Sequence, residues 1–408
     1  MLAATFRRVA DADWFDRTRA RAYHRLLLVL TLAIALAWVL TAHDGIDAAG
    51  KPIGTDFLAF WSASKLALSG HPAAPYDIAQ IYHVERATVA ADPGLSTFLY
   101  PPPFLLACLP LALIGYFPSL LLWLAATGSA YVAVARRWLG ELPGRTLIVI
   151  AFPAVLINAG HGQNGFLTAA LLGGGLLLIE RRPLVAGALL GALVIKPQIA
   201  LALPILVLAS GRWRVMAGGI ASAVALCLAS LLAFGPGAWT GFFDGQALGR
   251  AILERGFVEP GKMVSVFAAL RVLGAGSTAA YAAQAVAAAM AAGLLVLVCR
   301  RCRDNAGAQA AACAAATPLI SPFFLDYDLT LLAFPLAWAF CEGMRHGFRR
   351  YEKPVLVLAY VLPLIARPIA LDLGVPIAPL LLFALLALIV SAAKRRAIRL
   401  CPLDLNSG

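Results

Sequence analysis

Long apolar runs separated by short basic clusters shape the whole sequence. The first apolar run covers residues 26–42, and the clearest later runs lie at 145–160, 165–180, 184–195, 198–210, 215–234, 278–299, 306–320, 329–342, 354–370 and 375–393. Runs of about 20 residues match the thickness of a bilayer core, and shorter runs are typical of broken or re-entrant helices held inside protein. The pattern predicts an all-α, polytopic integral membrane bundle with about twelve transmembrane crossings, in one domain over residues 26–393.

Residues 104–135 fit this pattern less simply. The prolines at 101–103 favour an extended backbone just before the run, because proline fixes φ and disfavours helix in the residue that precedes it. One unbroken crossing would be too long, and two would place Arg136 and Arg137 outside the cell. We therefore expect one net crossing with a break near residues 115–118.

The distribution of charge gives the runs an orientation. The chain has a formal net charge of +12 with only 13% charged residues, and its arginines gather in short clusters between apolar runs. This is the positive-inside pattern, and no basic stretch is interleaved with aromatics that could stack on nucleic-acid bases. We expect a plasma (inner) membrane protein that binds no nucleic acid, with residues 1–25 and 394–408 cytoplasmic and the loops 41–100 and 235–277 on the outer, periplasmic side.

Two further features limit the alternatives. The run 26–42 is long for a signal-peptide core and lacks a small-residue cleavage site, so we expect a retained first span. Cys299 and Cys302 lack a second pair, or histidines, at the spacing of zinc ligands. The other cysteines lie in apolar runs or at their edges, where they behave as small hydrophobes. We expect no metal, no cofactor and no disulfide.

Asp56 is the leading candidate for chemistry. It stands in the first outer loop, ahead of an aromatic stretch that includes Trp61, and a helix beginning here would lay its aromatics along the bilayer interface. Ser64 and Lys65 would then lie on the wetter side of that helix. Asp56 could cap the helix, or it could act as a general base if the membrane surface partly desolvates it. The two roles are compatible.

Other polar stretches fall on the outer side under the same topology, at residues 160–165, 196–198, 235–277 and 321–328. The turn around Gln163 and Asn164 offers side chains that could hydrogen-bond sugar hydroxyls, although its glycines equally fit a plain helix–helix turn. Asp77 follows a proline-rich turn, which favours a turn and cap residue, and Tyr76 beside it fits an interface anchor. The aromatics within 235–277 favour an ordinary amphipathic surface loop over a lid or acceptor platform.

Two later stretches carry charge beside apolar runs. Lys196 lies between short apolar runs, before Pro197 and Gln198, with no carboxylate nearby in sequence. Such a charge usually faces a cavity or a partner, which favours anion or phosphate binding over snorkelling at a helix end. In the second stretch, residues 326–328 place two aspartates around a tyrosine; one aspartate is expected to cap the next helix and the other to point into a site.

Taken in order, these segments resemble glycosyltransferase family 87. The resemblance covers about residues 50–335 and rests on Gly54-Thr55-Asp56-Phe57 with Trp61, Tyr76-Asp77, Tyr100-Pro101-Pro102-Pro103, Gly162-Gln163-Asn164, Lys196-Pro197-Gln198, and Ser321-Pro322 with Asp326-Tyr327-Asp328. Each motif alone is weak, and the ordered combination on one membrane face is fairly specific.

The resemblance implies a GT-C-like fold with outer-side juxtamembrane helices and a hexosyltransferase activity. Family members resemble alpha-1,2-mannosyltransferases that use polyprenyl-phosphate-mannose, with an aspartate of the first outer loop as base, a role that carries over to Asp56. The donor would be a polyprenyl-phosphate-linked sugar, and the acceptor a hydroxyl of a lipid or glycan. Donor or acceptor contacts would come from Trp61, Lys65, Tyr76, Asp77, Gln163, Asn164, Lys196, Gln198, Asp326, Tyr327 and Asp328.

The late motif departs from the mannosyltransferase-like members, which have histidine after the aspartate where this chain has Tyr327. The sugar and the acceptor therefore stay open. A transporter or flippase of lipid-linked sugars would need the same groove and cation but no base. Such a protein typically has paired discontinuous helices in two related halves, and the sequence does not display them. A non-catalytic membrane scaffold is the third alternative, for which the polar stretches would be mere loops.

Overall fold

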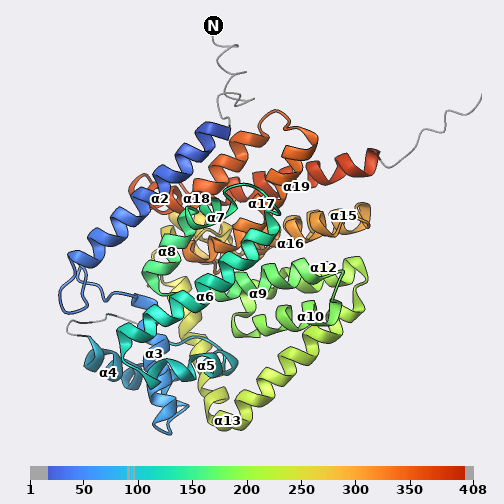
Figure 1. Cartoon of the computed structure of the whole chain (residues 1–408). Helices are drawn as coiled ribbons and strands as arrows, with labels where there is room; N and C mark the ends of the chain where they lie inside the picture. The colour runs from blue at the N-terminus through green and yellow to red at the C-terminus, as the bar shows by residue number, and fades with distance from the viewer. Residues whose placement is uncertain (1–16, 90–91, 93, 95–96, 400–408) are drawn as a thin grey trace, which may run out of the picture.

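The computed structural model describes residues 17–89, 92, 94 and 97–399. Of the expected cytoplasmic segments 1–25 and 394–408, residues 1–16 and 400–408 therefore lie outside the described residues. The described chain is helical almost throughout (Figure 1). Its α-helices are α2 (Arg17–Leu40), α3 (Thr55–Leu68), α4 (Ile78–Thr88), α5 (Pro102–Cys108), α6 (Tyr116–Trp138), α7 (Arg145–Ile150), α8 (Pro153–His161), α9 (Gly165–Leu178), α10 (Pro183–Gly191), α11 (Pro197–Ala200), α12 (Ala202–Ser210), α13 (Trp213–Glu254), α14 (Val266–Val272), α15 (Ser277–Arg301), α16 (Ala306–Ile320), α17 (Ala333–His346), α18 (Glu352–Asp372) and α19 (Ala378–Arg399). Short 3₁₀ turns are η1 (Ala74–Tyr76), η2 (Leu109–Leu113), η3 (Ala192–Ile195), η4 (Pro260–Lys262) and η5 (Asp326–Leu332).

Five helices of the described part are long and apolar enough to cross a membrane, namely α2, α6, α13, α15 and α18. Several shorter apolar helices accompany them, among them α9, α16 and α19. Large apolar side chains lie on the outside of the bundle, and Leu232 of α13 is 87% exposed. A surface of this kind is unfavourable in water and suits lipid. The chain is a multi-pass membrane protein, as its sequence predicts, while the number of about twelve crossings stays a prediction.

Glycine and proline decide where the apolar runs break. The break expected near residues 115–118 falls between η2 and α6, where Gly115 is extended. The run 145–160 forms two helices, because Pro153 begins α8 after an extended Phe152. The run 215–234 ends where the sequence predicts, at Gly235, whose φ of 70° and ψ of 177° are not helical. A second helix follows directly under the same label, α13, and reaches Glu254, so the segment 235–277 begins as a helix and not as a loop.

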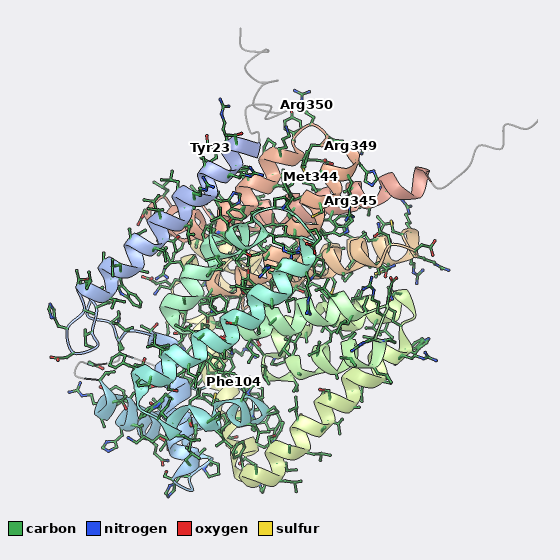
Figure 2. The ribbon with its side chains drawn as sticks, in the orientation of Figure 1. Tyr23, Phe104, Met344, Arg345, Arg349 and Arg350 are labelled. Atoms are coloured by element: carbon green, nitrogen blue, oxygen red, sulfur yellow. The ribbon has the colours of Figure 1, made fainter. Side chains whose placement is uncertain are left out.

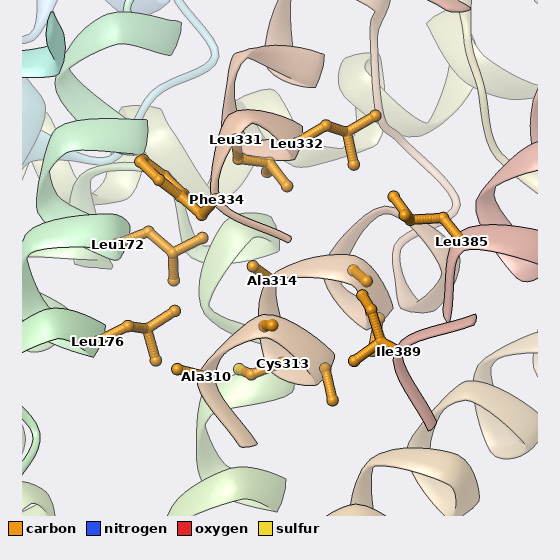
Figure 3. Packing of buried hydrophobic residues seen from close by; sticks show 14 of the residues in the cluster. Leu172, Leu176, Ala310, Cys313, Ala314, Leu331, Leu332, Phe334, Leu385 and Ile389 are labelled. Atoms are coloured by element: carbon orange, nitrogen blue, oxygen red, sulfur yellow. The ribbon is translucent and has the colours of Figure 1, made fainter. Parts of the chain in front are cut away.

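Helix α16 lies at the centre of the main hydrophobic core. Its side chains are buried from Ala308 to Leu319, and most of them are alanines. Figure 3 shows Ala310 and Ala314 between the leucines of α9 on one side and Leu385 of α19 on the other. Small residues let neighbouring helices approach closely, which increases van der Waals packing between helices in lipid. The shorter apolar helix α16 is thus held inside protein, where irregular helix ends can be tolerated.

The view of Figure 2 separates two ends of the bundle. Arg345, Arg349 and Arg350 lie at its upper end, near the start of α2 at Tyr23, whereas Phe104 of α5 lies in the lower half. Phe104 packs against the ring of Tyr100, with centroids 4.6 Å apart. The aromatic cluster around α3 and α5 is therefore remote from this group of arginines.

Candidate functional site

Helix α3 places Asp56 at the edge of a polar cluster. The helix begins at Thr55 after Gly54, whose φ of 74° suits glycine, and Asp56 stands in the first turn. The expected cap role is wrong, because Gly54 is the cap residue and no side chain caps the helix. The aromatics of α3 are buried in the protein, so the expectation that they lie along the bilayer interface is wrong. Ser64, expected on the wetter side, is buried too and donates to the Leu109 carbonyl, whereas Lys65 is exposed as expected. The Asp56 side chain itself is 34% exposed.

The turn between α8 and α9 holds the Asp56 carboxylate. Gly162 ends α8 with a φ of 64°, which turns the chain so that Gln163 faces α3. The Gln163 side-chain amide donates to Asp56 Oδ2 at 3.0 Å. Its Oε1 accepts from the Tyr100 hydroxyl at 3.0 Å and from the Asn164 backbone N–H at 2.7 Å. Since both donors fix the carbonyl end of Gln163, its NH₂ group is aimed at Asp56.

Lys196 lies deep in the protein, between η3 and α11. Its ammonium donates to Asp328 Oδ1 at 2.6 Å and to Asn164 Oδ1 at 3.0 Å, and each side chain of the ion pair is 2% exposed. The rings of Tyr327 and Tyr100 flank it, with centroids 5.1 and 6.0 Å from Nζ. Lys196 therefore does not snorkel to the surface, and the partner missing from its sequence neighbourhood is Asp328, 132 residues later.

The two aspartates of η5 have different partners. Neither caps α17, whose cap residue is Leu332, so that expectation is wrong. Asp328 binds Lys196, whereas Asp326 Oδ2 lies 3.5 Å from the guanidinium of Arg367 on α18. Burial raises the pKa of the Asp326 carboxyl, His161 and Arg367 oppose that rise, and Asp56 adds to it.

His161 joins the cluster at the end of α8. Its Nδ1 lies 3.0 Å from the Thr55 hydroxyl and 3.9 Å from Asp56 Oδ2, and its ring meets the Tyr327 ring edge-on at 5.6 Å. Sequence reasoning included His161 in a polar turn but did not single it out. It missed Arg367 altogether, although an arginine inside the apolar run 354–370 is itself a signal, because charge at membrane depth is costly. Tyr100 appeared in a motif without a role.

The structure thus brings together most of the predicted site residues, namely Asp56, Gln163, Asn164, Lys196, Asp326, Tyr327 and Asp328. Other predicted residues make different contacts. The Trp61 indole donates to the Ile114 carbonyl, and exposed Lys65 lies over the Trp61 ring. Tyr76 packs against Phe98 and Phe242. Asp77 caps α4, and Gln198 is half-buried in α11.

The arrangement combines a partly exposed carboxylate with buried, paired charges, on a multi-pass membrane scaffold. A sequence profile of glycosyltransferase family 87 matches residues 98–322, which is more than half of the chain. The chain belongs to glycosyltransferase family 87. This membrane glycosyltransferase has no match among curated proteins or solved structures. The family 87 match includes Tyr100, the 161–164 turn and Lys196, whereas Asp56, η5 and Arg367 lie outside its bounds.

Membership of family 87 makes the protein a transferase of sugars, and the cluster offers groups suited to that chemistry. A carboxylate fixed by one hydrogen bond can accept a proton from an incoming hydroxyl. Cations nearby can balance negative charge that develops on a leaving group. These charged and titratable groups come from four separate elements, so only the tertiary fold brings them together: Asp56 from α3, His161 from α8, Asp326 from η5 and Arg367 from α18.

Asp77→Ala provides a test of whether Asp77 acts in the site or only at its helix. Asp77 Oδ1 accepts from the backbone N–H groups of Ala79 and Gln80, and these hydrogen bonds, Gln80 foremost, hold the pKa of its carboxyl below the ordinary value. The ionised cap therefore stabilises α4 at neutral pH, and this stabilisation is lost as the pH falls through the lowered pKa. We expect the variant to unfold at lower temperature at neutral pH, with a smaller difference in acid, and to keep transfer within about twofold of wild type. A large loss of transfer without a change in thermal unfolding would place Asp77 in the site.

Proposed function

We propose that this family 87 enzyme transfers a hexose, mannose among the candidates, from a polyprenyl-phosphate-linked donor to a hydroxyl of a lipid or glycan acceptor. The transfer takes place at the outer face of the plasma membrane, with inversion at the anomeric carbon, and Asp56 is the general base. The bond between the anomeric carbon and the phosphate oxygen breaks, and its electron pair stays with the phosphate. The acceptor oxygen forms the new glycosidic bond and gives its proton to Asp56. The polyprenyl phosphate departs with one more negative charge, because it keeps the electron pair of the broken bond.

The position of the Asp56 carboxylate is the observation that supports this proposal most. One oxygen, Oδ2, accepts from Gln163, while among the described residues no recorded hydrogen bond engages Oδ1. The carboxylate is fixed in orientation yet accessible from outside, as an acceptor hydroxyl requires. Arg367, the ion partner of Asp326 at 3.5 Å, supplies a positive charge that can balance the negative charge growing on the leaving phosphate.

The distribution of basic residues supports the outer location. Arg345, Arg349 and Arg350 gather at one end of the view in Figure 2, and Phe104, which packs on Tyr100 beside the site, lies in the other half. Arginine-rich ends of membrane proteins face the cytoplasm. A site remote from that end would face the outer side, where lipid-linked sugars are used by the alpha-1,2-mannosyltransferases that this chain resembles in sequence.

Reconstitution with a panel of donors tests the proposed function. We expect purified protein in lipid bilayers to consume at least one polyprenyl-phosphate sugar in the presence of lipid acceptors. Mass spectrometry would detect a product one hexose heavier, and NMR would show inverted configuration at its anomeric carbon. Movement of donor across the bilayer without a new glycosidic bond would instead support a flippase. Absence of both would contradict the proposal.

A further inference from the structure

Arg367 is a charged residue within the last turns of α18, a helix that is otherwise apolar enough to span a membrane. An arginine at such a position is unfavourable in contact with lipid and usually faces the interior of a bundle or a watery cavity. Its side chain is 35% exposed, and it faces Asp326 of η5. Helix α18 packs against both η5 and α8, the helix that ends at His161, so the guanidinium lies at the edge of the same cluster.

The contacts of Arg367 leave most of its hydrogen-bonding capacity free. The guanidinium has five N–H donors in a planar fork. Over the residues that the structure describes, its recorded polar contact is the 3.5 Å ion pair with Asp326, which is longer than a strong charge-assisted hydrogen bond. Asp326 is buried, and its other oxygen accepts from the Tyr327 backbone N–H at 2.9 Å. Asp326 therefore orients the guanidinium without occupying its whole fork.

Lys196 is in the opposite situation. Its ammonium is 2% exposed and already donates to Asp328 and Asn164. A phosphate reaching this ammonium would have to compete with a carboxylate at 2.6 Å in a buried setting. Of the two cations, Arg367 is the one that combines exposure with open donors, and a guanidinium matches two phosphate oxygens at once, which an ammonium does not.

Resting on the proposed function, we propose that Arg367 binds the phosphate of the lipid-linked donor, and that Asp326 positions its guanidinium. The donor enters as a phosphodiester with one negative charge, and its phosphate leaves with two. Arg367 neutralises the charge that appears on the phosphate oxygen as the anomeric bond breaks, while the acceptor proton passes to Asp56. Lys196 in this arrangement maintains the buried structure behind the site through Asp328.

Binding of a phosphate lipid without sugar tests this assignment separately from transfer. The probe is farnesyl monophosphate, titrated against the full-length protein in nanodiscs, with farnesol as the matched ligand that lacks phosphate. We expect Arg367→Gln to raise the Kd for farnesyl monophosphate about 10- to 100-fold and to leave farnesol binding unchanged, because only the charge-assisted contact is lost. Arg367→Lys keeps the charge but not the fork, so an intermediate Kd is expected.

Lys262→Gln is the control for the loss of one positive charge. Lys262 has a similar exposure of 34%, pairs with Glu259, and belongs to η4, which packs against α18. We expect its Kd to stay within about twofold of wild type. The assignment is overturned if Arg367→Gln binds farnesyl monophosphate like wild type, or if Lys262→Gln loses as much affinity. If Arg367→Gln does not give monodisperse protein, Arg367→Lys decides, and an unchanged Kd for it overturns the bidentate contact. Should no donor in the panel be consumed while phosphate binding depends on Arg367, the proposed function fails and the phosphate site stands.

Discussion

Asp56→Asn is expected to lower the rate of sugar transfer about 10²- to 10⁴-fold, the usual contribution of a positioned general base. Asparagine has the shape of aspartate and still offers an oxygen to the Gln163 amide, which donates to Asp56 Oδ2 at 3.0 Å in the wild type. The loss therefore falls on proton acceptance and not on the fold. Steady-state transfer with a consumed donor measures the effect, and farnesyl monophosphate binding verifies that the donor site is intact.

Asp244→Asn is the matched control for this substitution. Asp244 is an exposed aspartate on α13, and its replacement removes the same charge from the surface. We expect its transfer rate to stay within about twofold of wild type. Turnover of Asp56→Asn close to the wild-type rate would remove Asp56 from the mechanism.

Lys196→Met is expected to destabilise the protein by about 3–5 kcal/mol, because it leaves the Asp328 carboxylate buried without its cation. Methionine has a similar length and suits an apolar site, so the missing charge and not a cavity dominates the loss. The ion pair measures 2.6 Å, and both side chains are 2% exposed. Thermal unfolding in detergent, followed by the fraction of monodisperse protein, measures the change.

A double variant separates the contribution of the Lys196–Asp328 ion pair to stability from the cost of leaving one charge unpaired. Lys196→Met with Asp328→Asn removes both charges, and we expect it to recover much of the stability lost in Lys196→Met alone, since no uncompensated buried charge remains. If Lys196→Met is as stable as wild type, the buried ion pair does not contribute to the stability of the fold, contrary to what its geometry indicates. If the folded double variant also lacks transfer, Lys196 or Asp328 acts in the reaction as well as in the fold.

The sequence predicted the local architecture well where apolar length and breakers decide it. The break between η2 and α6 falls at Gly115, close to Pro118, as expected. Helix α16 matches the apolar run 306–320. The break within α13 likewise falls at the glycine–proline pair 235–236, where the predicted run ends. The sequence did not predict the helix that follows this break to Glu254, inside the segment 235–277 that we expected to be a loop.

The candidate site shows the same division. Residue type alone singled out Asp56, Lys196 and the η5 aspartates, because charged side chains are rare and costly in such a chain. Their partners were not predictable from sequence spacing. Asp328 lies 132 residues after Lys196, and Arg367 comes from a helix that periodicity identifies only as a span.

By itself, the sequence determined that this protein is a membrane helical bundle with family 87 motifs, since hydrophobic length and ordered polar segments are properties of the chain. The tertiary structure decided which charges face one another: Lys196 is enclosed by Asp328 and Asn164, and Arg367 is left partly open beside Asp326. The physical reason is that the free energy of a buried charge depends on the partner and the exposure that helix packing gives it, and neither is a local property of the sequence.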